Sequence, residues 1–140
     1  MAHAYCVDGT NVVRGCHGYG GPEFRGQEEA DSERLVAALG QLCKELEDRI
    51  EVEVIFDGAT RPLAARAPNL RVRFAHECAA DDLILDCVRS SRYANTGRVT
   101  VVTGDGDLGR KAADEGARWL RVAPREPLET ILNAIEKRFS

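Results

Sequence analysis

The sequence predicts a single three-layer α/β/α domain over residues 1–140, built on a central parallel sheet of about five strands. Short apolar runs that suit strands alternate with longer segments whose apolar residues recur at helical spacing, a pattern typical of βαβ units. Three of the apolar runs end abruptly in acid and glycine residues. A chain of 140 residues can bury one core, and no linker indicates a second domain.

The first strand is predicted at residues 4–7, whose unbroken apolar run suits a strand covered on both faces. It leads directly into Asp8-Gly9-Thr10-Asn11. Residues 14–30 then hold five glycines and Pro22, so we expect a mobile loop there. The loop lacks a Walker or dinucleotide motif, yet its cations and rings would suit single-stranded bases, the alternative being a plain surface loop. Those side chains are Arg14, His17, Tyr19, Phe24 and Arg25.

A crossover helix is expected from Ser32 to about Asp48, with Asp31 and Ser32 as candidate caps. The second strand ends in Asp57-Gly58, which repeats the opening pattern. Residues 58–76 contain four arginines and no acid. This asymmetry indicates either a phosphate-binding side or charges that protect an edge strand at residues 70–75. The arginines are Arg61, Arg66, Arg71 and Arg73.

The next predicted helix starts near Ala79 and separates two adjacent acids. At about 100° per residue, Asp81 lies roughly 90° from the centre of the apolar stripe and Asp82 lies nearly opposite. Asp81 is therefore the better candidate to point along the sheet edge. We expect Asp82 and Asp86 to face water, where acids in a first helical turn also complement the helix dipole.

The fourth strand, from Arg98, ends in Thr103-Gly104-Asp105, so Asp105 lies at its tip. Asp107 is either a further site residue or the N-cap of the helix that runs to Glu115. Residues 118–122 supply a fifth strand. The closing segment carries an apolar face that indicates a packing helix; the face comprises Leu128, Ile131, Leu132, Ile135 and Phe139.

Right-handed crossovers between parallel strands bring the strand carboxyl ends to one edge. With the strand order 3-2-1-4-5, Asp8 and Asp105 flank the switch point, with Asp57 and Asp81 beside them. Carboxylates so close would raise one another's pKa values unless a divalent cation neutralised them, and an oxygen-only cluster suits Mg²⁺ or Mn²⁺. Two such ions can activate a water for phosphodiester cleavage, with Asn11 orienting Asp8 or a water.

Composition and charge narrow the functional classes. The net charge of −4 argues against a protein that coats nucleic acid by bulk attraction, without excluding a nuclease. The five cysteines lack finger or ribbon spacing, which favours reduced core thiols over structural zinc. No apolar run approaches a membrane span and no signal peptide is evident, so we expect a cytoplasmic protein. The histidines form no obvious acid/base pair, which disfavours a metal-free ribonuclease.

Four motifs in order resemble the NYN branch of PIN-like nucleases, and within it the YacP-like bacterial proteins. They are Asp8-Gly9-Thr10-Asn11, Val54-Ile55-Phe56-Asp57-Gly58, Ala80-Asp81-Asp82 and Val101-Val102-Thr103-Gly104-Asp105-Gly106-Asp107-Leu108. Gly104, Asp82 and Thr10 depart from the family's usual residues.

The resemblance implies a metal-dependent endoribonuclease that leaves 5′-phosphate and 3′-hydroxyl ends. It implies single-stranded or messenger RNA as substrate and association with the ribosome. We expect Asp8, Asp57, Asp81, Asp105 and Asn11 to be catalytic, with the four acids and Asp107 as metal ligands. Residues predicted to bind substrate are Arg14, Arg61, Arg66, Thr103 and Arg110.

Three alternatives compete with this hypothesis. A haloacid-dehalogenase-like phosphatase is disfavoured because Cys6 occupies the position of its nucleophilic aspartate. A PIN toxin is similar in size and fold, although the Asp8-Gly9-Thr10-Asn11 opening and the Asp57-Gly58 strand end favour the NYN branch. A non-enzymatic RNA-binding adaptor of the same fold is the third, and the retained carboxylates argue against it.

Overall fold

The computed structural model describes residues 2–15, 25–76 and 79–139. The strands are β1 (His3–Asp8), β2 (Ile50–Asp57), β3 (Leu70–Ala75), β4 (Val99–Thr103) and β5 (Arg118–Arg121). The helices are α1 (Gly9–Gly15), α2 (Arg25–Leu46), α3 (Ala80–Ser90), α4 (Gly106–Asp114) and α5 (Leu128–Lys137), with a 3-10 turn η2 at Glu47–Arg49.

The five strands form one parallel sheet in the order β3-β2-β1-β4-β5, which confirms the predicted topology. β1 lies at the centre and pairs with β2 and β4, its Val7 facing Val54 on one side and Val102 on the other. All strands run the same way, so their carboxyl ends share one edge.

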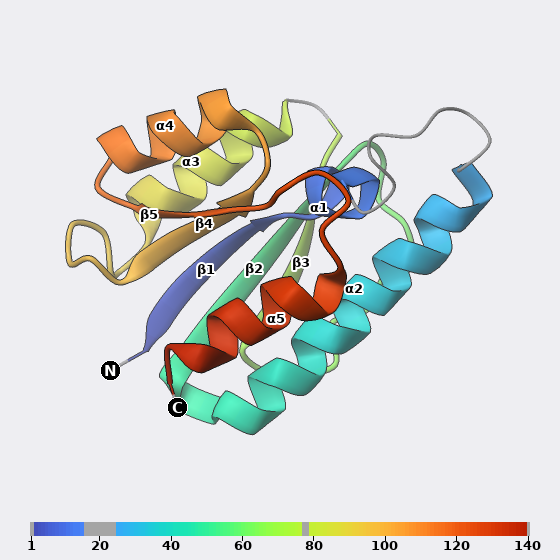
Figure 1. Cartoon of the computed structure of the whole chain (residues 1–140), viewed down its shortest axis with the longest axis horizontal. Coiled ribbons are helices and arrows are strands. Elements are labelled where there is room, and N and C mark those ends of the chain that lie inside the picture. Colours follow the sequence, from blue (N-terminus) through green and yellow to red (C-terminus); the bar gives the residue numbers. More distant parts are fainter. Residues whose placement is uncertain (1, 16–24, 77–78, 140) are drawn as a thin grey trace.

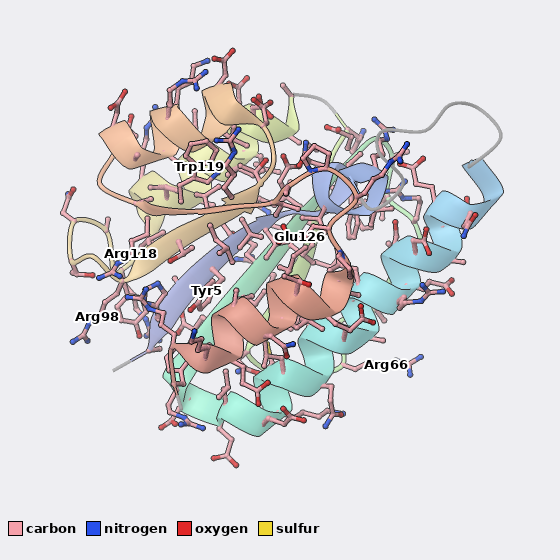
Figure 2. All side chains as sticks on the ribbon, viewed as in Figure 1. Tyr5, Arg66, Arg98, Arg118, Trp119 and Glu126 are labelled. Atoms are coloured by element: carbon pink, nitrogen blue, oxygen red, sulfur yellow. The ribbon has the colours of Figure 1, made fainter. Side chains whose placement is uncertain are left out.

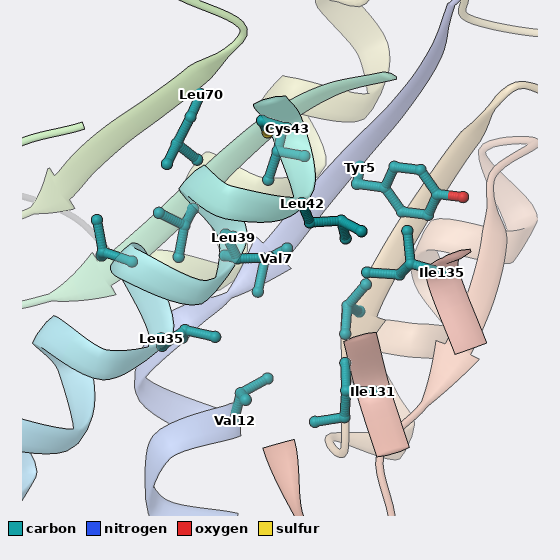
Figure 3. Packing of buried hydrophobic residues seen from close by; sticks show 14 of the residues in the cluster. Tyr5, Val7, Val12, Leu35, Leu39, Leu42, Cys43, Leu70, Ile131 and Ile135 are labelled. Carbon is teal, nitrogen blue, oxygen red and sulfur yellow. The ribbon is translucent and has the colours of Figure 1, made fainter. Parts of the chain in front are cut away.

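Helices cover both faces of the sheet, with α2 and α5 on one side and α3 and α4 on the other (Figure 1). The alternation of β1 divides its side chains between two cores: Tyr5 and Val7 join the α2/α5 core, whereas Ala4 and Cys6 join the α3/α4 core. Figure 3 shows the α2/α5 core, in which leucines of α2 meet Ile131 and Ile135 of α5.

The segment after β1 differs from the prediction at both of its ends. Residues 9–15 form α1, and α2 begins at Arg25 rather than Ser32. Asp31 and Ser32 are therefore buried within α2 rather than caps, and the Ser32 hydroxyl donates back to the Glu28 carbonyl at 2.8 Å. The proposed base-holding side chains of His17, Tyr19 and Phe24 lie outside the described residues, as do Cys16 and Cys78.

Further features of the framework concern its thiols, its edge strand and its helices. Cys6, Cys43 and Cys87 are free thiols, of which the first two are buried. Arg71 and Arg73 on the edge strand β3 both lie within ion-pair distance of Glu53, which supports the edge explanation for this pair of charges. Within the described residues, none of the helices combines the length and apolarity needed to span a bilayer.

Candidate active site

Asp8 ends β1 and is the most buried of the predicted acids, with 5% of its surface exposed. The Thr103 hydroxyl donates to its Oδ2 at 2.9 Å. Burial, together with the charges of Asp81 and Asp57, raises the pKa of Asp8 to about 7. The hydrogen bonds from Thr103 and from the backbone N–H of Asn11 oppose this rise only in part.

The turn after β4 is tied to both β1 and α1. The Asp105 N–H donates to Thr103 Oγ1 at 3.1 Å, and the Gly104 N–H donates to Asn11 Oδ1 at 2.7 Å. Asn11 therefore reaches Asp8 through its backbone, while its side chain holds the turn that presents Asp105. Thr103 is 0% exposed, and its hydroxyl donates to Asp8 and accepts from the Asp105 N–H, while the substrate-binding role expected of it stays a prediction.

Asp81 lies in the first turn of α3 and is partly buried, whereas Asp82 and Asp86 are exposed. This confirms the helical-face prediction for the three acids. Burial raises the pKa of Asp81, followed by the charges of Asp105 and Asp57, while Lys111 opposes the rise. Asp81 is thus the side chain that links the carboxylates of β1, β2 and the β4 turn into one electrostatically coupled group.

Asp57 and Asp105 occupy the two neighbouring strand ends. The Asp57 side chain is exposed, and its N–H donates to Thr10 Oγ1 at 2.8 Å, which anchors the end of β2 to α1. Asp105 is the N-cap of α4, because its Oδ1 accepts from the N–H groups of Asp107 at 2.9 Å and Leu108 at 3.3 Å. The alternative that Asp107 is the cap is therefore wrong.

Asp107 and three of the arginines predicted to bind substrate lie apart from the four acids in their contacts. Arg110 donates to the exposed carboxylate of Asp107 at 2.8 Å, and Arg14 donates to Glu28 at 2.8 Å. Arg66 is exposed and projects beyond α2 in the view of Figure 2. These three cations make no contact with the four acids among the interactions of the described residues.

Arg61, in contrast, contacts the backbone of one of the four acids, Asp57. Its Nη2 donates to the Asp57 carbonyl at 3.2 Å. Its guanidinium carbon lies 5.5 Å from the ring centroid of Phe56 and 5.2 Å from that of Phe74. The aromatic rings therefore hold this cation beside the end of β2.

Two residues that the sequence analysis missed contribute to this edge. Thr10 supplies the acceptor for the Asp57 N–H, and Lys111 of α4 lies close enough to Asp81 to lower its pKa. An exposed lysine in a helix carries no sequence signal of such a neighbour. Thr10 had a signal, since it belongs to the Asp8-Gly9-Thr10-Asn11 turn.

The carboxylates of Asp8, Asp57, Asp81 and Asp105 fit Mg²⁺ or Mn²⁺ by donor chemistry, because hard divalent cations prefer oxygen ligands. Their coupled pKa values also fit a site that gains from a positive charge. However, over residues 2–15, 25–76 and 79–139 no three Asp, Glu, His or Cys side chains stand in an arrangement ready to hold a metal ion. The donor set is present and the ligand cage is not preformed.

A five-stranded parallel sheet between two helical layers, with acids gathered at its carboxyl edge, defines a domain with the PIN-like fold. The family model of the YacP-like NYN domain matches residues 5–139, and the chain belongs to this family of nuclease-like domains.

A solved structure of similar fold is a crystal structure of a mutant of Rae1 (YacP) from Bacillus subtilis, with a TM-score of 0.65 and 21% sequence identity. The match covers 96% of this chain and 77% of that chain. No curated protein was found to match the sequence.

Proposed function

We propose that the chain is a metal-dependent endoribonuclease that cleaves RNA at the acid edge, the edge of the sheet that carries Asp8, Asp57, Asp81 and Asp105. Membership of a nuclease-like family supports the reaction class. The observation that carries the proposal is the environment of Asp8: a carboxyl that is 5% exposed, has a pKa of about 7 and lies near other carboxylates. Its hydrogen-bond partners, Thr103 and Asn11, are neutral, so the group lacks the countercharge that a divalent cation would bring.

The residues divide into three roles in this proposal. The four carboxylates hold Mg²⁺ or Mn²⁺, which when bound would supply an activated water and charge stabilisation at the leaving oxygen. Thr103 and Asn11 fix the orientation of Asp8 and the turn that carries Asp105. Asp8 must be ionised to act as a ligand, so cation uptake at neutral pH requires that its carboxyl lose a proton.

Two cations flank the acids and suit the RNA backbone. Lys111 faces Asp81 from α4, and Arg61 lies at the end of β2. We assign to them the substrate phosphates on either side of the cut. Single-stranded or messenger RNA, 5′-phosphate and 3′-hydroxyl ends, association with the ribosome and a cytoplasmic site of action extend the proposal through the family resemblance.

The test is cleavage of end-labelled single-stranded and structured RNA by purified protein in Mg²⁺, Mn²⁺ or EDTA. We expect cleavage in either cation, none in EDTA and none by Asp8→Asn. Asp82→Asn is the matched control, because it removes one exposed carboxylate from the same helix turn as Asp81. Cleavage that persists in EDTA or in Asp8→Asn would refute a metal mechanism centred on Asp8.

The second candidate is an RNA-binding adaptor that keeps the fold without catalysis. One observation favours it, namely that the described acids are not arranged to hold a metal as they stand. Salt-dependent RNA binding by the wild-type protein, with no cleavage in either Mg²⁺ or Mn²⁺, would establish the adaptor and exclude the nuclease.

A further inference from the structure

A cavity of about 420 Å³ lies toward the amino ends of the strands, away from the acid edge. It is bounded by β1, β4 and β5 on the sheet side and by the end of α5. Tyr5 lines it three residues before Asp8 on β1, which corresponds to about 10 Å along the strand. Its other polar lining residues are Thr100, Arg118 and Arg138.

Tyr5 carries a buried hydroxyl with nothing to bond. The residue is 2% exposed, and its Oη has no hydrogen-bond partner. The neighbouring hydroxyl of Thr100 is already engaged with His3 Nε2 at 2.7 Å. Figure 3 shows the Tyr5 ring beside Ile135, with its oxygen directed away from Leu42. A buried donor without an acceptor is costly, so an acceptor oxygen placed here would recover that cost.

Two arginines, Arg118 and Arg138, line the cavity, and a third, Arg98, lies nearby. Arg98 follows Gly97, the residue that Arg118 contacts, in the loop before β4, and both arginines are labelled on the same side of the molecule in Figure 2. The Nε of Arg118 donates to the Gly97 carbonyl at 3.0 Å, while the Nη1 of Arg98 is buried without a partner. Within the described part of the chain, none of the three forms an ion pair with a carboxylate.

The positive potential of these arginines is visible at His3. Burial lowers the pKa of His3, and together with the charges of Arg138, Arg118 and Arg98, in that order, it brings the pKa to about 4. The charged side chains that act on His3 are therefore all cations. An anion would relieve their mutual repulsion as well as satisfy the Tyr5 hydroxyl.

We propose that this cavity binds a phosphate group. Arginine forks match phosphate oxygens in bidentate pairs, and the buried, unpartnered hydroxyl of Tyr5, a lining residue, supplies a third donor. Leu120, Ala134 and Ile135 form an apolar wall that suits the rest of a phosphate monoester. The site is separate from the acid edge and does not depend on the proposed nuclease activity.

Inorganic phosphate is the probe for the test, titrated by calorimetry into the 140-residue protein at constant ionic strength set with chloride. We expect saturable binding by the wild-type protein and its loss in the Arg118→Gln, Arg138→Gln double variant. The Arg34→Gln, Lys44→Gln double variant is the control, since it removes the same charge from exposed positions of α2. No saturable binding, or equal affinity in all these proteins, would overturn the proposal.

Tyr5→Phe separates ligand binding from folding. Loss of one hydrogen bond to a charged acceptor should weaken phosphate binding by roughly tenfold. Because the hydroxyl has no partner in the free protein, the variant should melt no lower than the wild type. Unchanged phosphate affinity in Tyr5→Phe would refute the assignment of this hydroxyl.

Competition identifies the source of the phosphate. Displacement by adenosine 5′-monophosphate would indicate a monoester, and displacement by an RNA oligonucleotide without terminal phosphates would indicate the backbone diester; both results support the site. Phosphate binding that the Arg61→Gln, Lys111→Gln double variant abolishes would place the anion beside the acid edge instead and overturn the proposal.

Discussion

Replacing Asp8 with asparagine tests the acid edge without any cleavage assay. The pKa of Asp8 is about 7 in the folded protein, against an ordinary value of 3.8. At about 1.4 kcal/mol per pKa unit, ionising this buried carboxyl therefore costs the folded state about 4 kcal/mol. Because the pKa is raised on folding, the protonated carboxyl contributes stability that is fully present below pH 3.8 and is lost as pH rises through 7. In EDTA at pH 8 the wild-type protein therefore carries the full cost of a buried carboxylate, which the asparagine amide avoids.

We expect Asp8→Asn to unfold in urea with a free energy about 1 to 3 kcal/mol larger than the wild type at pH 8 in EDTA, since the amide loses part of the gain through imperfect hydrogen bonding. At pH 5 the wild-type protein recovers about 2 to 3 kcal/mol through this group, so the difference should shrink. Mg²⁺ or Mn²⁺ at pH 8 should stabilise the wild type and not the variant. The reasoning would be refuted if Asp8→Asn were less stable than the wild type at pH 8 and the difference in unfolding free energy were the same at pH 5.

Three further predictions concern other sites. Asp81→Asn should reduce RNA cleavage by more than about 100-fold while Asp82→Asn stays near wild type, and equal losses would contradict the assignment of faces on α3. The pKa of His3 is lowered from 6.5 to about 4 in the folded protein, so the neutral imidazole contributes about 3 kcal/mol to the unfolding free energy above pH 6.5, and this contribution is lost as pH falls through 4. The difference in unfolding free energy between the wild type and His3→Gln should therefore become smaller as pH falls through this range. A difference that stays constant would argue against a buried neutral imidazole. Gly109→Ala should lower the unfolding free energy by about 1 to 3 kcal/mol, because a Cβ there would overlap the Trp119 indole; a gain in stability, as helix propensity alone would give, would show that the indole moves aside.

The sheet could be predicted from the sequence because its strands are short apolar runs with clear ends, and because parallel crossovers have one favoured hand. The beginning of α2 could not. Asp31 and Ser32 have cap-like sequences, yet they are buried inside a helix that starts earlier. Arg14 of α1 pairs with Glu28 at 2.8 Å, so this part of α2 is stabilised by contact with a helix that local propensity does not predict.

The acid edge was also only partly predictable. The positions of Asp8, Asp57 and Asp105 at strand ends follow from the strand pattern, and the relative exposure of Asp81 and Asp82 follows from helical periodicity. The position of Thr103 against Asp8 does not, because it depends on the register between β1 and β4.

The bond from Thr103 to Asp8 joins residues 95 positions apart, which has a consequence for biosynthesis. Chains fold as they leave the ribosome, and contacts distant in sequence form late. Asp8 is made 95 residues before its hydroxyl partner, which arrives only with β4, together with the turn that carries Asp105. A nascent chain therefore exposes β1 with an unpaired edge, and the acid edge assembles only when β4 inserts beside it.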